Sequence, residues 1–248
     1  MYFWKCWRDN RLRFIGTMII VPALCIYITT MVARHGDPDA MRRGLHPSAI
    51  GVWSATTEFV LGAWTSFFTV VWGALLGASG VGEEFQQGTA GFLLSRPRRR
   101  RYWIWVGWSA GLCELGGMIL VTVAATFATL THLTGHVLTW WPLATTLPLI
   151  IGGLVVYGLT YFMTMVARSG RQGLSYSIGI LFISLLLPAA AAYNWNVHLP
   201  SVFGFMMDTC KWFGRPTGAF PAGALFGWTI VALAFPLATQ LLLDRAEA

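Results

Sequence analysis

The sequence predicts an all-α integral membrane protein with six transmembrane helices. Hydrophobic residues make up 56 % of the 248-residue chain and charged residues 11 %, and the mean hydropathy is +0.60. So few polar side chains cannot cover a water-soluble globule of this size. The apolar residues also form unbroken runs close to the roughly 20 helical residues that cross a bilayer, rather than the short alternating segments of a β-barrel. No linker or repeat divides these runs, so we expect a single transmembrane domain over residues 1–248.

The six apolar runs define the predicted spans, which cover residues 14–32, 59–80, 106–130, 145–166, 174–192 and 222–243. The first run has a basic flank but no small-residue cleavage site, because Tyr27 and Met31 stand near its end. A signal peptide would carry such a site. We therefore expect the first run to be retained as a membrane helix.

Residues 1–13 are too charged to cross a membrane. At helical spacing Phe3 and Trp7 fall on one face, and Lys5 and Arg8 on the other. This pattern predicts an interfacial helix that lies in the headgroup plane with Trp7 as an anchor. A plain basic flank of the first span is the alternative interpretation.

Six crossings place both termini on one side of the membrane, and basic residues indicate which side. Five of the 17 lysine and arginine residues fall on the opposite side, which leaves twelve on the side of the termini; the five are Arg34, Arg42, Arg43, Lys211 and Arg215. By the positive-inside rule, both termini are cytoplasmic. The net charge of +7 then reflects orientation and attraction to an anionic leaflet, and it gives no reason to expect nucleic acid as a partner.

The segment between the second and third spans reads GEEFQQGTAGFLLSRP over residues 82–97. Helical spacing from Glu83 gives an apolar stripe, and Pro97 disfavours helix at the residue before it. We therefore expect a cytosolic helix of about three turns. Four arginines follow, Arg98, Arg99, Arg100 and Arg101, and are expected to anchor the third span at the membrane surface. A solvated loop with ordinary orientation charges remains an alternative.

This segment resembles the cytosolic signature of permeases of the ABC (ATP-binding-cassette) type-2 exporter family, in which an acid, a Gly-Thr pair and Leu-Leu-Ser-x-Pro recur in this order. The resemblance implies a coupling helix that docks on a separate ATPase subunit. The residues implied in this contact are Glu83, Glu84, Phe85, Gly88, Thr89 and Phe92. It further implies two cytosolic ABC ATPases that bind ATP and magnesium, a second permease copy in a homodimer, and export across a bacterial cytoplasmic (inner) membrane.

The chain itself carries no Gly-x-x-x-x-Gly-Lys-Ser/Thr stretch, so we expect no ATPase activity and no cofactor in it. Two other functions are a membrane scaffold or sensor and a membrane-embedded enzyme. The enzyme would need Glu114, His132 and His136 to converge, yet the first two are about 27 Å apart along one helix. His132 and His136 have the i, i+4 spacing of zinc pairs but no third ligand nearby, so no metal site is expected.

Two glutamates lie in or at the predicted spans. Glu114 is about 16 Å along the third helix from Trp103, near the middle of the bilayer. Two interpretations are open: a neutral acid hydrogen-bonded to a neighbouring helix, or a group that lines the substrate route or a subunit interface. Glu58 is at the outer edge of the second span, and we expect either a solvated acid after Thr56 and Thr57 at a helix start or a role in substrate release.

Two glycine pairs at i, i+4 spacing, Gly73 with Gly77 and Gly223 with Gly227, predict close helix packing. The outer segment 194–221 is rich in aromatic and apolar residues, whose exposure to water would be costly. We therefore expect short helices there that dip into the outer leaflet or cap a dimer.

Overall fold

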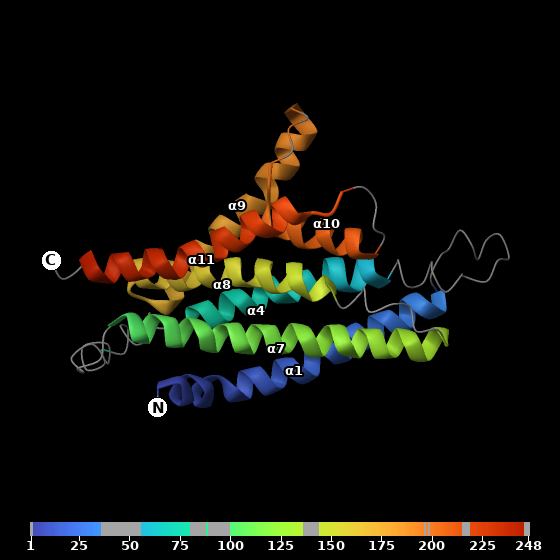
Figure 1. The fold of residues 1–248 in the computed structure, drawn as a ribbon, viewed down its shortest axis with the longest axis horizontal. Helices are drawn as coiled ribbons and strands as arrows, with labels where there is room; N and C mark the ends of the chain where they lie inside the picture. Colours follow the sequence, from blue (N-terminus) through green and yellow to red (C-terminus); the bar gives the residue numbers. More distant parts are fainter. Residues whose placement is uncertain are drawn as a thin grey trace.

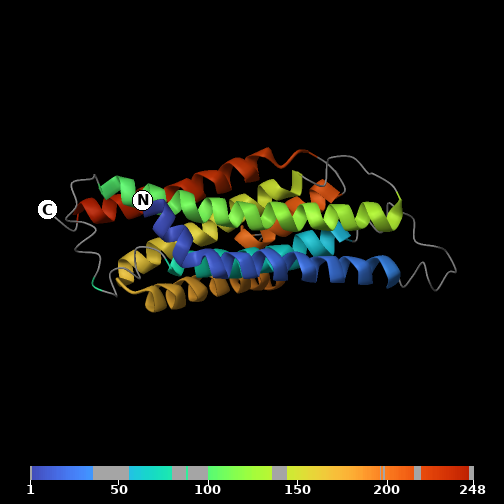
Figure 2. The same cartoon turned by 90° about the horizontal axis from the view of Figure 1, so that it is seen from below.

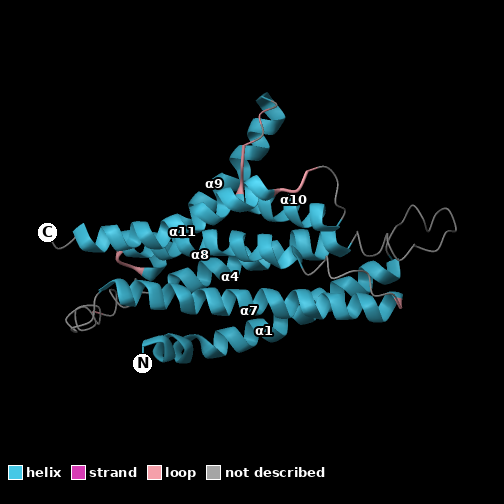
Figure 3. Ribbon diagram, in the orientation of Figure 1, coloured by secondary structure: helices cyan, strands magenta, loops and turns pink. Residues whose placement is uncertain are grey.

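The computed structural model describes residues 2–35, 56–79, 88, 100–135, 144–195, 197, 199–214 and 219–245. All regular secondary structure within these residues is helical (Figure 3). The elements are α1 (Tyr2–His35), a π-helix η1 (Thr57–Thr65) that continues into α4 (Ser66–Ala78), α7 (Arg100–Thr134), α8 (Thr146–Ala167), α9 (Gly170–Trp195), α10 (Val202–Gly214) and α11 (Ala222–Arg245). Six of these helical stretches are long and apolar enough to cross a membrane, which confirms the predicted number of spans.

The spanning helices form one elongated bundle with both chain termini at the same end (Figures 1 and 2). This is the arrangement expected of six crossings. Helix α8 is the central element, in contact with α4, α7, α9, α10 and α11. Residues of α4, α7 and α8 supply much of the apolar core, which includes Leu115, Met118, Leu149 and Val156, each 0 % exposed.

Close packing of α4 on α8 depends on small residues, as the first glycine pair predicts. A Cβ atom on Gly73 would lie 3.1 Å from the carbonyl oxygen of Gly153, and one on Gly77 would lie 2.7 Å from that of Tyr157. The second pair differs, because a Cβ on Gly223 or Gly227 would meet nothing within 4 Å. The close packing expected at that pair is not found within this chain.

The first span begins much earlier than its apolar run. Helix α1 is one continuous stretch of 34 residues from Tyr2, and Figure 2 shows that its first turns lie at an angle to the rest. The predicted interfacial segment is therefore helical and continuous with the span. Its position at a membrane surface stays a prediction, and the side chain of Trp7 lies outside the described residues.

The second span contains a feature that the sequence pattern does not indicate. Its first nine residues, Thr57–Thr65, form the π-helix η1. In a π-helix the backbone bonds join residues five apart, and the hydroxyl of Thr65 also bonds the carbonyl oxygen of Val60 at 2.9 Å. The sulfur of Cys25 lies 3.7 Å from the same hydroxyl, which joins α1 to η1. π-Helical turns are rare and occur often at functional sites.

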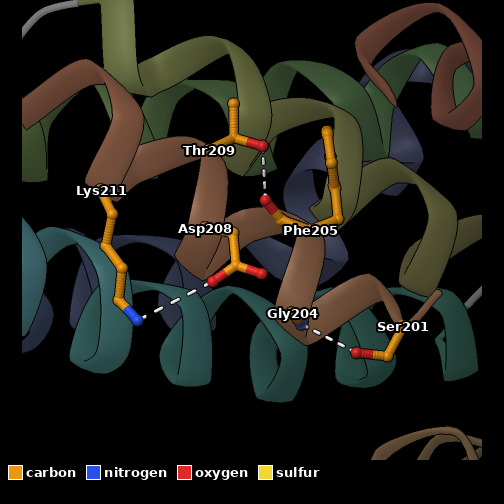
Figure 4. A network of polar contacts seen from close by, with 6 residues as sticks. All are labelled: Ser201, Gly204, Phe205, Asp208, Thr209 and Lys211. Atoms are coloured by element: carbon orange, nitrogen blue, oxygen red, sulfur yellow. Dashed lines mark hydrogen bonds and ion pairs between the residues drawn. The ribbon is translucent and has the colours of Figure 1, made fainter. Parts of the chain in front are cut away.

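Helix α10 confirms that the segment between the last two spans contains helix. Ser201 accepts a hydrogen bond at 2.9 Å from the backbone N–H of Gly204 and so caps the helix, while Lys211 and Asp208 form an exposed ion pair at 3.8 Å (Figure 4). Phe205 and Met206 are buried, and α10 packs against η1 and α8. The apolar face of α10 is therefore covered by the same chain, whereas Trp195, Val197 and Phe220, outside this helix or at the end of α9, stay exposed.

Helix α9 is the least covered span, and its last turns leave the bundle at a steep angle (Figure 1). The helix contains Pro188, and a proline in a helix interior removes a backbone hydrogen bond and kinks the helix. Phe182 and Ile183 are 60 % and 61 % exposed. These side chains are free to face lipid or another chain.

Candidate functional site

Glu114 lies in the interior of the helix bundle. Its side chain is 1 % exposed, and neither carboxylate oxygen has a hydrogen-bond partner among the described residues. The first interpretation, a hydrogen bond to a neighbouring helix, thus finds no support among the described residues. Within a single chain Glu114 is enclosed by its own helices; the other interpretation, that it lines the substrate route or a subunit interface, stays a prediction.

The neighbours of Glu114 on α7 show which way it points. A Cβ on Gly111 would meet the ring of Tyr157 in α8, while one on Gly117 would lie 3.3 Å from Met18 and 3.6 Å from Phe14 in α1. At 3.6 residues per turn, Glu114 bisects the arc between these two glycines, about 60° from each. It therefore faces the sector between α8 and α1.

The second span occupies that sector. Helix α4 packs on α8, and the π-helix η1 packs on α1; both also contact α7. Three polar side chains of α4 that the sequence analysis did not single out lie buried there: Ser66 and Thr69, both 0 % exposed, and Trp72. Their i, i+3, i+6 spacing in an otherwise apolar span was the available signal, since residues three apart are neighbours on a helix surface.

Glu58 lies elsewhere. It occupies the first turn of η1 and is half-buried. The side chain of Thr56 makes no capping hydrogen bond to this turn. Glu58 and Glu114 are thus not brought together, and the proposed role of Glu58 in substrate release stays a prediction.

Most of the expected contact with an ATPase falls outside the described residues, including Glu83, Glu84, Phe85, Thr89 and Phe92. Gly88 is described: it is an exposed turn residue with φ of +72°, and a Cβ there would meet nothing within 4 Å. Such a left-handed conformation suits glycine and ends a right-handed helix rather than continuing it. Gly88 itself therefore does not have right-handed helical geometry; the rest of the predicted helix lies outside the described residues.

The basic anchor is described only in part. Arg98 and Arg99 lie outside the described residues, whereas Arg100 and Arg101 form the first turn of α7. The third span thus begins within the arginine run, six residues before the apolar run at Val106. The contacts of these arginine side chains stay a prediction.

No cluster of three or more metal-ligating side chains occurs in the part of the chain that the structure describes. His132 is exposed near the far end of α7, and His136 lies outside that part. Within the helix, His132 and Glu114 are about 27 Å apart. Glu114 and His132, two of the three residues that a membrane-embedded enzyme would need, are therefore not brought together.

An apolar groove of about 390 Å³ runs between α4, α9 and α10. Its lining includes Phe67, Val71, Leu75, Leu174, Phe182 and Phe203. The one hydroxyl in the lining, that of Ser184, already donates to the carbonyl oxygen of Leu181 at 2.8 Å. The groove can hold a hydrocarbon chain but offers nothing to a charged group.

Comparison with known proteins agrees with this architecture. The family model described as ABC-2 family transporter protein matches residues 11–203, which include the first five spans and the segment between α4 and α7. No curated protein sequence matches the chain. With more than three quarters of its length matched and six helices able to span a membrane, the chain belongs to the ABC-2 transporter family, as a multi-pass membrane permease component.

Proposed function

We propose that this chain is the permease subunit of an ABC exporter of the cytoplasmic membrane, and that two copies of it work with two cytosolic ATPase subunits. Membership of the ABC-2 family is the observation that carries the proposal. The chain would form the membrane route, and the ATPases would supply ATP, magnesium and the work of transport. Energy would then enter the permease by contact, since the sequence has no Walker A motif of its own.

The connection between α4 and α7 is the proposed point of contact. The end of α4 and the start of α7 lie at the end of the bundle that carries both termini (Figure 1). Residues 80–99, which join them, include the proposed contact residues Glu83, Glu84 and Gly88. A partner that moved this segment would act on both adjoining spans at once.

The arrangement also supports an apolar or amphipathic cargo. The groove between α4, α9 and α10 is lined almost wholly by hydrocarbon. Helix α9, which forms one of its walls, exposes large apolar side chains along its length. A second copy against α9 would enclose the groove, which is the reason we expect the pair to be a homodimer.

Purification of the chain with its ATPase and reconstitution in lipid vesicles test this function. We expect Glu83→Ala and Gly88→Ala to lower transport per ATP hydrolysed while the complex stays assembled. Gly135→Ala is the matched control, because Gly135 has φ of +66° and equally open surroundings but lies beyond the opposite end of α7. Unchanged coupling in Glu83→Ala and Gly88→Ala, or equal loss in Gly135→Ala, would contradict the proposed contact.

A further inference from the structure

Several buried polar atoms of α4 and α7 have no hydrogen-bond partner within the described residues. The hydroxyl oxygens of Ser66 and Thr69, the indole nitrogen of Trp72 and both carboxylate oxygens of Glu114 have no hydrogen-bond partner within the described residues. Buried polar groups in proteins are nearly always hydrogen-bonded, and each exception needs an explanation. Thr29, Thr56 and Trp108 also have such atoms; the four residues named first are considered together because their helices, α4 and α7, contact each other.

Two contacts place α4 and α7 at the same level. A Cβ on Gly153 of α8 would lie 2.7 Å from Cδ2 of Leu115 in α7 and 2.7 Å from Cγ2 of Thr69 in α4. Leu115 and Thr69 therefore meet over Gly153. Glu114 precedes Leu115, at about 1.5 Å along the helix axis, and points to the sector that α4 and η1 occupy.

The chemistry of the cluster indicates what fills it. The hydroxyls both donate and accept hydrogen bonds, the indole donates and the carboxylate accepts. Among the described residues, no lysine, arginine or histidine side chain forms a hydrogen bond with either carboxylate oxygen of Glu114. Acids inside a membrane span pair with one another or with backbone carbonyls, or face water, and buried water bonds polar groups that otherwise lack partners.

The π-helix is an independent sign at the same place. It ends at Thr65, directly before Ser66, so the cluster begins where the backbone returns from π to α geometry. Thr65 does not add an unpaired group, because its hydroxyl is bonded to Val60. The π-helix η1 therefore lies directly next to Ser66. π-Helical turns occur often at functional sites.

We propose that Ser66, Thr69, Trp72 and Glu114 line a hydrated polar site inside a single copy of the chain, which admits water and small cationic solutes and excludes hydrocarbon. The site differs in chemistry and position from the apolar groove between α4, α9 and α10. It does not depend on the proposed export function, since every residue that forms it belongs to one bundle. Its test can therefore succeed or fail separately from the transport assay.

Cysteine accessibility tests the proposal. The four native cysteines, Cys6, Cys25, Cys113 and Cys210, are replaced by alanine, and Ser66→Cys, Thr69→Cys and Thr122→Cys are made singly in that background. Thr122 is the matched control, because it is also 0 % exposed and on α7 but its hydroxyl donates to the carbonyl oxygen of Met118 at 2.8 Å. Size-exclusion profiles show that each variant is folded, and the nearly isosteric Ser66→Cys keeps the test valid if Thr69→Cys is not.

The probe is a small cationic methanethiosulfonate, which reacts with thiolates and hence with thiols that water reaches. We expect Ser66→Cys and Thr69→Cys to react at least about tenfold faster than Thr122→Cys. Addition of Glu114→Gln should slow the cationic reagent more than a neutral reagent of similar size. Equal rates at the three positions, or a Glu114→Gln effect that does not depend on reagent charge, would overturn the proposal.

Discussion

The hydroxyl of Tyr157, at the middle of α8, donates a hydrogen bond to the carbonyl oxygen of Gly107 in α7 at 3.0 Å. The ring of Tyr157 also occupies the space beside Gly111, one turn further along α7. A glycine carbonyl in a helix is easily reached from outside, because no side chain covers it. This hydrogen bond joins α7 to α8 about two turns before Glu114.

Tyr157→Phe should remove the hydrogen bond but keep the ring packing. A net loss of about 0.5–1.5 kcal/mol is usual for one hydrogen bond, which corresponds to a fall of a few degrees in Tm for a chain of this size. Thermal unfolding in detergent measures the change. Tyr27→Phe is the control, since Tyr27 is 60 % exposed and should leave Tm unchanged; equal Tm values for the two variants would show that the bond contributes nothing.

Gly77→Ala should destabilise the bundle by separating α4 from α8. The new Cβ would lie 2.7 Å from both the carbonyl oxygen of Tyr157 and Cβ of Thr160. Overpacking of this kind usually costs about 1–3 kcal/mol. Gly227→Ala, with open space around it, should not lower Tm in the isolated chain, and a comparable loss in both variants would contradict the packing described.

Glu114→Gln should fold with little change in stability, because the carboxylate has no hydrogen bond to another described residue to lose. Leu115→Ala, next along the helix and 0 % exposed, should instead cost about 2–5 kcal/mol as a cavity-forming change. Thermal unfolding of the two variants side by side tests this contrast. In reconstituted transport, Glu114→Gln should alter rate or substrate range; kinetics identical to those of the unmodified protein would count against a role in the route.

The Cys210 thiol should be unreactive in the folded protein. Cys210 lies in α10, outside the spanning helices; it is fully buried, and this burial raises the pKa of its thiol above the usual value. Alkylation at pH 8 should therefore modify Cys210 only after denaturation. Rapid modification of Cys210 in folded protein would show that α10 is open to solvent.

The same raised pKa predicts a pH dependence of stability. As pH rises above about 8.5, the thiol of the unfolded chain loses its proton before the folded one does, so the free energy of unfolding falls. Cys210→Ala should remove this contribution. The difference in Tm between pH 7 and pH 10 should thus be smaller in Cys210→Ala than in the unmodified protein.

The spans were predictable because each is an apolar run bounded by charged or turn residues. Pattern alone could not decide which faces pack. Gly73 with Gly77 and Gly223 with Gly227 share one spacing, yet only the first pair meets another helix of the chain. Small residues permit close approach, and the tertiary arrangement determines whether a partner is present.

The candidate site was predictable only in part. The position of Glu114 in the span indicated a buried acid, but its lack of a partner depends on the helices around it. The π-helix could not be predicted, because the pattern of apolar residues over Thr57–Thr65 is the same as that of an ordinary α-helix. The sequence alone could not predict a role for Ser66, Thr69 and Trp72, because that role depends on how α7 packs against α4.

Helix α7 has 35 residues and no proline inside it, so it is about 52 Å long. A bilayer core is about 30 Å thick, and even a tilt of about 40° leaves α7 taller than that core. The helix is therefore a rigid rod that overhangs the hydrocarbon layer. A displacement of the end of α7 next to residues 80–99 would therefore also move its other end, on the opposite face of the membrane, because no proline interrupts the helix.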